Sequence, residues 1–199
     1  TVPTPIYRND ASLLNGNKQL AATASGGVGM SLDMTYFQDA DGRSYYAWQQ
    51  LGATYIATMD PKDPAHVTSS PVRIVTPEYA WNAAIAEGPN VTLRDGKLYL
   101  MFSGSGVGKT YTTGLAVADA SGTDLTDPAS WTVLNYPIQK SGPFNGEMQL
   151  GTGHGMWSED EDGNQIYVFH AYATKNLGSV NAAGRDMFVR RVHLSLIHI

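Results

Sequence analysis

The sequence of 199 residues contains no cysteine, which excludes disulfides, thiolate nucleophiles and thiolate metal sites. It also contains no run of about 18 apolar residues of the kind that crosses a membrane as a helix. Basic residues number 13 against 18 acidic ones, so the formal net charge is -5 and no basic patch is visible to meet nucleic-acid phosphates. We therefore expect neither a membrane nor a nucleic acid as partner.

Turn-forming and aromatic residues, by contrast, are plentiful. The 21 glycines, 10 prolines and 10% of aromatic residues suit an all-β protein with many turns. No stretch shows the apolar period of an amphipathic helix. The composition assigns no compartment, because a secreted bacterial protein can also lack cysteine.

Three stretches of the chain share a hairpin pattern, with Asp-Gly pairs at residues 41–42, 95–96 and 162–163. Asp-Gly between two apolar runs predicts a tight hairpin, because its turn needs positive φ. An aromatic strand follows each pair (SYYAWQQ, KLYLMFSG and QIYVFHAY), and a third strand-like run follows later (ATYIATMD, TTGLAVADA and DMFVRRVH). The first two repeats continue into a fourth β-rich run after DPAHVT and DPASWT. Repeats of about four antiparallel strands predict the blades of a β-propeller.

The stretch SGSGVGKT at residues 103–110 looks like a phosphate-binding loop but departs from it. Ser103 stands where that motif requires its first glycine. A phosphate loop also opens a helix, whereas the following TYTTGLAVADA is β-branched and aromatic and favours a strand. We interpret the stretch as the loop between the second and third strands of the middle repeat, and no nucleotide is expected.

An ionisable residue lies nine positions before each hairpin glycine: Asp33, Glu87 and His154 (42 − 33, 96 − 87 and 163 − 154). The first strand of a propeller blade lines the central axis, so we expect these side chains to converge on one axial pocket. A single Asp, Glu or His near a strand start is usually a cap, a turn residue or a solvated side chain. Three at one repeat position favour a functional site, because charged groups on inner strands are costly without partners or substrate.

Converging carboxylates suit glycoside hydrolysis, in which a protonated acid donates to the leaving oxygen and a second carboxylate handles water or the anomeric carbon. Glu87 is the better acid candidate, because its apolar neighbours in IAEGPNV favour the protonated form and a nearby Asp33 carboxylate acts in the same direction. His154 is expected to orient a carboxylate, to bind substrate hydroxyls or to lie over a hydrated cation in the axial channel.

At these residues the sequence resembles glycoside hydrolase family 43, over nearly all of residues 25–193. The resemblance lies in SLDMTYFQDADG, in PEYAWNAAIAEGPNVTLRDGKLYLMFSGS, and in GTGHGMW with IYVFHAY, which look like motifs of that family's second, third and fourth blades. It implies an all-β, five-bladed propeller, of which about three to three and a half blades are expected here. It also implies inverting hydrolysis of α-L-arabinofuranosides or β-D-xylosides.

The resemblance implies a role for each candidate residue. Glu87 would be the general acid, and Asp33 would modulate and orient that acid. His154 would be the axial histidine and contact substrate, and in some family members it approaches a bound calcium ion; no other cofactor is implied. Trp81 is a candidate for stacking on a sugar, with blade core as the alternative. Arg185 is a candidate for reaching the substrate, with a surface charge as the alternative.

The sequence also departs from the family pattern. No Asp-Pro motif of a general base precedes Asp33, and Asp10, the one earlier Asp, has different surroundings. No closing fifth blade follows, and Gly155-Met156 replace a polar pair after the axial histidine. We therefore expect a partial propeller that is inactive by itself. Its expected parts are a blade-one remnant (1–24), blades two (25–80), three (81–145) and four (146–193), and a non-native tail (194–199).

The sequence thus predicts an inverting, α-L-arabinofuranosidase-like glycosidase whose partner is an arabinose- or xylose-containing oligosaccharide or polysaccharide of plants. Two alternatives stay open. One is a β-D-xylosidase of the same fold. The other is a non-catalytic carbohydrate-binding propeller, whose acids only hydrogen-bond sugar hydroxyls.

Overall fold

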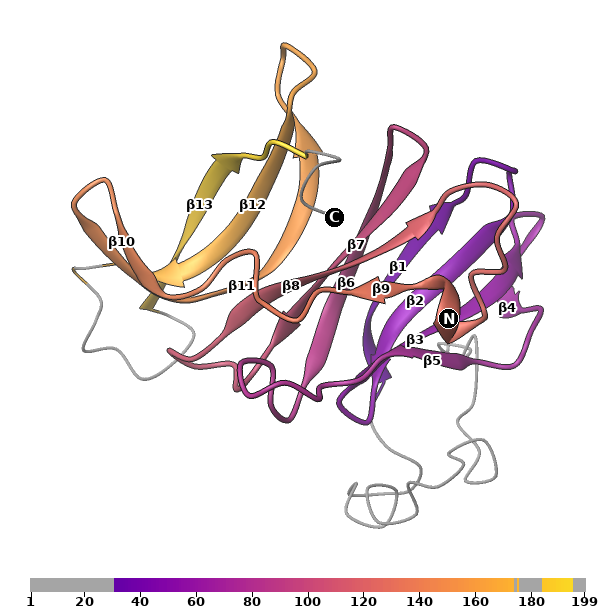
Figure 1. Cartoon of the computed structure of the whole chain (residues 1–199), viewed down its shortest axis with the longest axis horizontal. Coiled ribbons are helices and arrows are strands. Elements are labelled where there is room, and N and C mark those ends of the chain that lie inside the picture. The colour runs from indigo at the N-terminus through magenta and orange to yellow at the C-terminus, as the bar shows by residue number, and fades with distance from the viewer. Residues whose placement is uncertain (1–30, 174, 176–183, 195–199) are drawn as a thin grey trace, which may run out of the picture.

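The computed structural model describes residues 31–173, 175 and 184–194 of the chain, so the predicted blade-one remnant and Asp10 lie outside the described residues. In this part, the strands form three antiparallel sheets that follow one another along the chain. Figure 1 shows the first sheet at the right, the second in the middle and the third at the left. No helix in the described ranges is long and apolar enough to span a membrane. The predicted all-β class is confirmed.

The first two sheets are meanders that open with an Asp-Gly hairpin. The first has the order β1-β2-β3-β4, with β5 also paired to β3, and the second has the order β6-β7-β8-β9. The 3-10 turn η2 (Pro128–Ser130) precedes β9. The strands are β1 (Ser31–Gln38), β2 (Ser44–Gln50), β3 (Ala53–Asp60), β4 (Asp63–Val67), β5 (Val72–Val75), β6 (Ala86–Arg94), β7 (Lys97–Gly104), β8 (Thr112–Asp119) and β9 (Thr132–Val133).

The third sheet has the order β10-β11-β12-β13 and gains its fourth strand in a different way. β10 pairs with the start of β11 across a turn in which Asn145 and Gly146 both have positive φ. In the first two sheets the additional strands pair instead with β3 and β8. The strands are β10 (Gly142–Phe144), β11 (Glu147–Glu159), β12 (Gln165–Tyr172) and β13 (Arg185–Arg191).

The turns lie where the sequence predicts them. Gly42, Gly96 and Gly163 have φ of 80°, 76° and 75°, and each lies in the hairpin between the first two long strands of its sheet. Residues 105–111 join β7 to β8, which confirms the inter-strand loop for residues 105–110 of SGSGVGKT, whereas Ser103 and Gly104 are the last residues of β7.

The middle sheet is packed on both faces. Along β7, Leu98, Leu100 and Phe102 belong to a cluster shared with the first sheet, whereas Tyr99 and Met101 belong to a cluster shared with the third. Successive side chains of a strand point to opposite faces, so KLYLMFSG is continuously apolar because both faces are covered. The inner strand β6 contacts β1 on one side and β11 on the other. Four-stranded antiparallel sheets that pack face to face, with their first strands side by side along a central axis, are the blades of a β-propeller. The predicted propeller fold is therefore confirmed.

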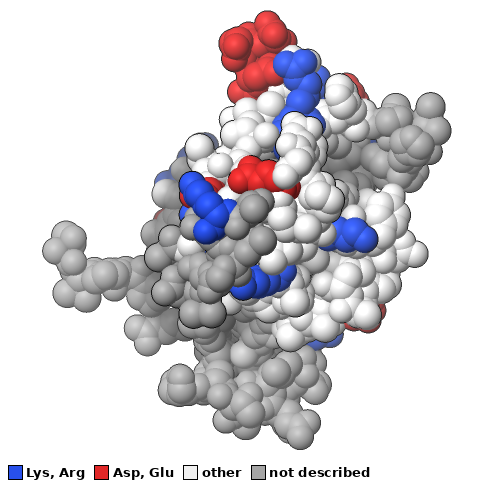
Figure 2. Space-filling model, turned by 90° about the vertical axis from the view of Figure 1, so that its left-hand side faces the viewer, with Lys and Arg blue, Asp and Glu red and all other residues white. Residues whose placement is uncertain are grey.

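The third sheet has one apolar face on which no described sheet packs. Met156, Met187 and Val189 are 54%, 73% and 52% exposed. They share this face with Val168, which pairs in register with both Met156 and Val189. Figure 2 views the molecule from the side of the third sheet, where charged side chains of both signs are scattered over a mostly uncharged surface. An uncovered apolar face of this kind is typical of a surface that contacts further protein.

Candidate active site

A β-bulge interrupts each of the three inner strands. The register of β1, β6 and β11 with the following strand shifts near the same point of each sheet. At these bulges Asp33, Gly88 and His154 have φ of 60°, 58° and 48°. Positive φ is uncommon for residues other than glycine, although Asp and His tolerate it better than most. Bulges re-aim side chains and are frequent next to active sites, so the chain is shaped locally to present Asp33 and His154.

Glu87 lies one residue before the bulge position, which Gly88 occupies. The expectation that Asp33, Glu87 and His154 occupy one equivalent position is therefore wrong for Glu87. The reason is that the bulge lies eight residues before the hairpin glycine in the middle sheet (96 − 88) and nine residues before it in the other two (42 − 33 and 163 − 154). The middle hairpin turns over two residues, Asp95 and Gly96, whereas the other two loops are longer. A count from the hairpin glycine thus does not transfer between repeats.

Asp33 nevertheless contacts residues of both other inner strands, β6 and β11. Its Oδ2 accepts a hydrogen bond from the backbone N–H of Gly88 at 3.2 Å. Its Oδ1 lies 3.6 Å from Nε2 of His154, and the two side chains are 19% and 45% exposed. The glycine leaves room for the imidazole, because a Cβ at position 88 would lie 3.3 Å from the His154 ring. Asp33 therefore joins the three sheets at the axis.

Glu87 is 6% exposed and is held by a residue from the loop after β7. The hydroxyl of Tyr111 donates to Oε1 of Glu87 at 2.5 Å, and the same phenolic oxygen lies 3.2 Å from Nδ1 of His154. The backbone N–H of His154 donates to Oγ of the buried Ser103 at 2.7 Å. Burial and then the hydrogen bond to Glu87 raise the pKa of Tyr111 above its usual range, so the phenol keeps its proton. One network therefore joins Glu87 through Tyr111 and His154 to Asp33.

Arg185 reaches the edge of this network from β13. Its Nη1 donates to Nε2 of His170 at 3.0 Å, and its Nη2 donates to the carbonyl of Val107 at 2.9 Å. The His170 ring stacks on Tyr111 and His154, with ring centroids 5.8 and 6.4 Å apart. These contacts fix Arg185 beside the candidate site, and a contact with substrate stays a prediction.

His170 makes the stability of the folded protein depend on pH. Burial, and then the charges of Arg185 and His154, lower the pKa of His170 to about 4. In the unfolded chain the pKa of a histidine returns to about 6.5, so between these two pH values the unfolded state binds more protons and stability falls as pH falls. We expect the drop in Tm from pH 7 to pH 5 to be smaller in His170→Gln than in the wild type.

His66→Gln is the matched control for this measurement. His66 is exposed and contacts only Asp63 among the ion pairs of the described residues, so its loss should leave the drop in Tm unchanged. An unchanged drop in His170→Gln would contradict the assignment of the acid sensitivity to His170.

Trp81 packs beside the cluster between the first two sheets. Its Nε1 donates to the carbonyl of Asn135 at 3.0 Å, and its ring stacks on Tyr79 and Phe102 with centroids 6.1 and 6.0 Å apart. These are the contacts expected of the blade-core alternative. Stacking of Trp81 on a sugar stays a prediction without a supporting contact.

The calcium ion expected near His154 is not supported by the residues around it. Calcium takes about 6–8 oxygen ligands. Among the described residues, no group of three or more His, Asp or Glu is arranged to hold a metal. The neighbours of His154 are the Asp33 carboxylate, the Tyr111 hydroxyl and the His170 ring, a set with one carboxylate.

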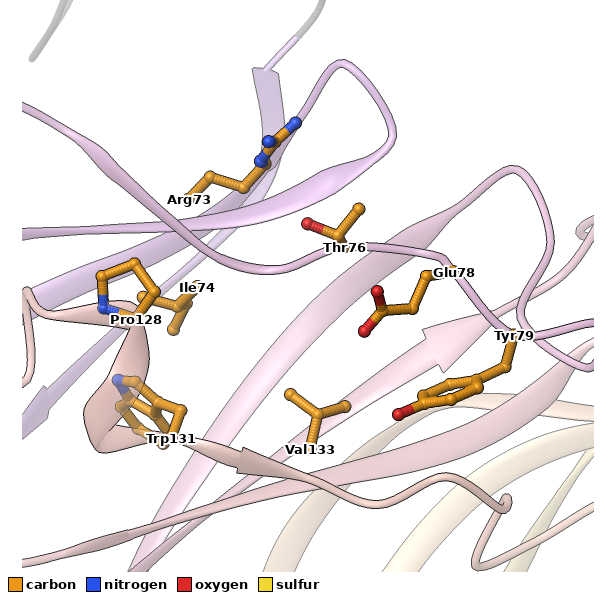
Figure 3. A pocket seen from close by; sticks show the side chains of 8 residues that line it. All are labelled: Arg73, Ile74, Thr76, Glu78, Tyr79, Pro128, Trp131 and Val133. Carbon is orange, nitrogen blue, oxygen red and sulfur yellow. The ribbon is translucent and has the colours of Figure 1, made fainter.

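A pocket of about 590 Å³ lies between β5 and the segment of η2 and β9 (Figure 3). Arg73, Thr76 and Glu78 are exposed at this pocket, and Ile74 and Trp131 are buried against it. None of the candidate catalytic residues lines it. Among the described residues, no buried polar atom without a hydrogen-bond partner lines it either. The pocket therefore lacks the fixed polar groups of a built recognition site.

Tyr111, His170 and Ser103 belong to this network but are not among the residues predicted from the sequence. Tyr111 stands immediately before TTGLAVADA, where an aromatic residue favours a strand. His170 interrupts the aromatic strand QIYVFHAY, and a polar ring in such a strand is the one signal for it in the sequence. Ser103 stands where a phosphate loop would have its first glycine. All three act through contacts between sheets, which local sequence does not show.

Known proteins are similar in sequence to most of this chain. The family model for glycosyl hydrolases family 43 matches residues 17–196. An extracellular exo-alpha-(1->5)-L-arabinofuranosidase from Streptomyces chartreusis is 33% identical over 159 residues, which cover 74% of this chain and 46% of that protein. A protein of the same name from Streptomyces avermitilis is 33% identical over 176 residues, which cover 82% of this chain and 35% of that protein. The chain thus spans less than half the length of these two relatives.

Solved structures agree with the sequence matches. The crystal structure of an alpha-L-arabinofuranosidase from Lactobacillus brevis superposes with a TM-score of 0.74 at 26% identity. The match covers 87% of this chain and 55% of that chain. The three sheets and their order around the axis therefore occur together in an enzyme of known structure.

Proposed function

The chain belongs to glycosyl hydrolases family 43, and from that premise we propose that the full-length gene product is an inverting glycoside hydrolase that acts on arabinofuranosides of plant polysaccharides. The names of the relatives support the sugar, because the two Streptomyces proteins and the Lactobacillus brevis enzyme are called arabinofuranosidases. The expected partner is an arabinose-containing oligosaccharide or polysaccharide.

The observation that carries the proposal is the carboxyl group of Glu87. It is nearly buried, its Oε1 is held by Tyr111, and the Asp33–His154 pair lies on the other side of Tyr111. An oriented acid beside a second carboxylate is what protonation of a glycosidic oxygen requires. A purely structural propeller would gain nothing from these charged groups on its inner strands.

In the proposed reaction, Glu87 donates its proton to the glycosidic oxygen as the bond from that oxygen to the anomeric carbon breaks. A water molecule attacks the anomeric carbon from the opposite face, and a second carboxylate takes its proton. Asp33 orients the acid. The described residues offer no candidate for the base that activates this water, and Asp10 lies outside them. Because the resemblance implies a base in an Asp-Pro motif, and the sequence has no such motif before Asp33, we expect the 199-residue chain by itself to bind sugar without hydrolysing it.

Two alternatives compete with this proposal. A β-D-xylosidase of the same fold would use the same acid and differ in the sugar that fits. A non-catalytic carbohydrate-binding propeller would use Glu87 and Asp33 only as hydrogen-bonding groups, and the lack of a base candidate among the described residues fits it as well as it fits a partial propeller.

The test is hydrolysis of 4-nitrophenyl α-L-arabinofuranoside and 4-nitrophenyl β-D-xylopyranoside by the full-length gene product between pH 5 and 8. We expect faster release of 4-nitrophenol from the arabinofuranoside, and proton NMR should show the inverted anomer as the first product. Faster release from the xyloside would establish the first alternative. No release from either compound, with sugar binding retained, would establish the second and overturn the proposal.

A further inference from the structure

We infer that Tyr111 is a positioning residue for the general acid, whose hydroxyl holds Oε1 of Glu87 so that the other oxygen, Oε2, carries the proton to the leaving group. This inference rests on the proposed function, because it gives Glu87 the role of acid. It adds a residue that reaches the acid from the loop after β7, at the end of the stretch SGSGVGKT.

The ring of Tyr111 is fixed on several sides. It lies against β11 at Gly153, where a Cβ would overlap Cδ1 and Cε1 of the ring, so this contact requires glycine. His170 stacks on the ring with centroids 5.8 Å apart, and the guanidinium of Arg185 holds His170 in turn. The backbone N–H of Tyr111 donates to the carbonyl of Gly108 at 3.2 Å. These contacts fix the position of the Tyr111 hydroxyl relative to Glu87, as is required of a positioning group.

The directions of the hydrogen bonds follow from the chemistry of the phenol. A tyrosine hydroxyl has one proton to donate, and the 2.5 Å contact with the carboxyl group of Glu87 takes it. The phenolic oxygen is then the acceptor for His154, so Nδ1 of His154 carries a proton. This leaves Nε2 of His154 as the atom that faces Oδ1 of Asp33 at 3.6 Å. Tyr111 thereby couples the orientation of the acid to the Asp33–His154 pair.

A second consequence concerns the two oxygens of Glu87. Because Oε1 accepts from Tyr111, the acid proton belongs on Oε2, and rotation of the carboxyl group would break the bond. Without the hydroxyl, the carboxyl group can rotate and present its proton in unproductive directions. Protonation of the leaving group should then suffer, whereas binding of the sugar and attack by water should not.

The experiment compares Tyr111→Phe with the wild-type full-length gene product on arabinofuranosides whose leaving groups differ in basicity. A 2,4-dinitrophenyl arabinofuranoside needs little proton donation, and an arabinobiose needs full donation. We expect kcat/KM to fall about tenfold or more for arabinobiose, because Glu87 becomes a carboxylate as it gives up its proton and would then lack a hydrogen bond to a charged group. For the dinitrophenyl compound kcat/KM should stay within about twofold. A merely structural role would lower both values alike, and that result, or no loss at all, would overturn the inference.

Tyr167→Phe is the matched control. Tyr167 is a buried tyrosine of the neighbouring sheet whose hydroxyl bonds to Oγ1 of Thr113, so the variant also loses one phenolic hydrogen bond. It does not touch Glu87, and we expect the ratio of the two kcat/KM values to equal that of the wild type.

A crystal structure of Tyr111→Phe keeps this inference separable from the proposed function. If the wild-type protein hydrolyses no glycoside, the proposed acid role fails, but the positions of the side chains can still be compared. We expect Glu87 to occupy more than one rotamer in the variant. A Glu87 carboxyl group that stays in its wild-type position would overturn the positioning role whatever the activity.

Discussion

Glu87→Gln is expected to lower kcat/KM for arabinobiose by about 10² to 10⁴-fold, the usual contribution of a positioned general acid. Glutamine has nearly the same shape, and its amide oxygen can still accept the hydrogen bond from Tyr111. The variant therefore keeps the fold and the network but has no acidic proton to give. With a 2,4-dinitrophenyl leaving group the loss should be much smaller, because that leaving group departs as a stable anion.

Glu159→Gln tests whether the loss belongs to the site. Glu159 is exposed at the end of β11, the strand that also carries His154, so the same chemical change is made on an inner strand away from the acid. Its kcat/KM should match the wild type on both substrates. Equal losses on both substrates in Glu87→Gln would point to a binding or folding role and would remove Glu87 as the acid.

Much of the fold follows from local patterns in the sequence. The Asp-Gly pairs predict the three hairpins because positive φ is needed at those glycines, and the structure has it there. The runs SYYAWQQ and KLYLMFSG predict strands, and the structure has β2 and β7 there, with almost every residue buried. The fourth strand of the third sheet is not among the predicted strands, although Asn145-Gly146 is a hairpin signal as strong as Asp-Gly. The reason is that β10 has only three residues and one of them is a proline, so no strand pattern precedes the turn.

Fewer features of the candidate site than of the fold can be predicted from the sequence. Asp33 and His154 could be found by counting along the repeat, because their hairpin loops have matching lengths. The same count reaches Glu87, although the bulge of β6 lies at Gly88. Glu87 therefore does lie in the same network as Asp33 and His154, but it does not occupy the same position of its strand. Tyr111 could not be found in this way, since it lies in the loop between β7 and β8 and reaches Glu87 only through the packing of that loop against β11.

The glycines of GTGHG show how packing and chemistry are coupled in this fold. Gly153 receives the ring of Tyr111, and Gly155 receives the ring of Tyr167. Gly151 receives the carbonyl oxygen of Gly108, from the loop that leads to Tyr111. Ser141 connects the same places, because its Oγ donates to the carbonyl of Lys109 and accepts from the N–H of Gly151. Residues 151–155 therefore support the loop between β7 and β8, whose Tyr111 holds Glu87.

Gly151→Ala is accordingly expected to destabilise the protein more than Gly163→Ala, the same change at a hairpin glycine. Gly151 has φ of 67°, and an added Cβ would overlap the carbonyl oxygen of Gly108, which is backbone and cannot rotate away. The left-handed conformation costs an alanine about 1–2 kcal/mol, and overpacking costs about 1–3 kcal/mol more. Thermal or urea unfolding of the full-length gene product should therefore show a loss of about 2–5 kcal/mol in the free energy of unfolding.

Gly163→Ala separates the two causes, because Gly163 has a similar φ of 75° but no atom within 4 Å of an added Cβ. It should lose only the conformational part, about 1–2 kcal/mol. The difference between the two variants then measures the contact between β11 and the loop at Gly108. Because that loop leads to Tyr111, Gly151→Ala should also lower activity on arabinobiose more than on the dinitrophenyl compound. Equal losses of stability in the two variants would mean that the loop at Gly108 does not pack against Gly151. The position of Tyr111 would then not depend on this contact.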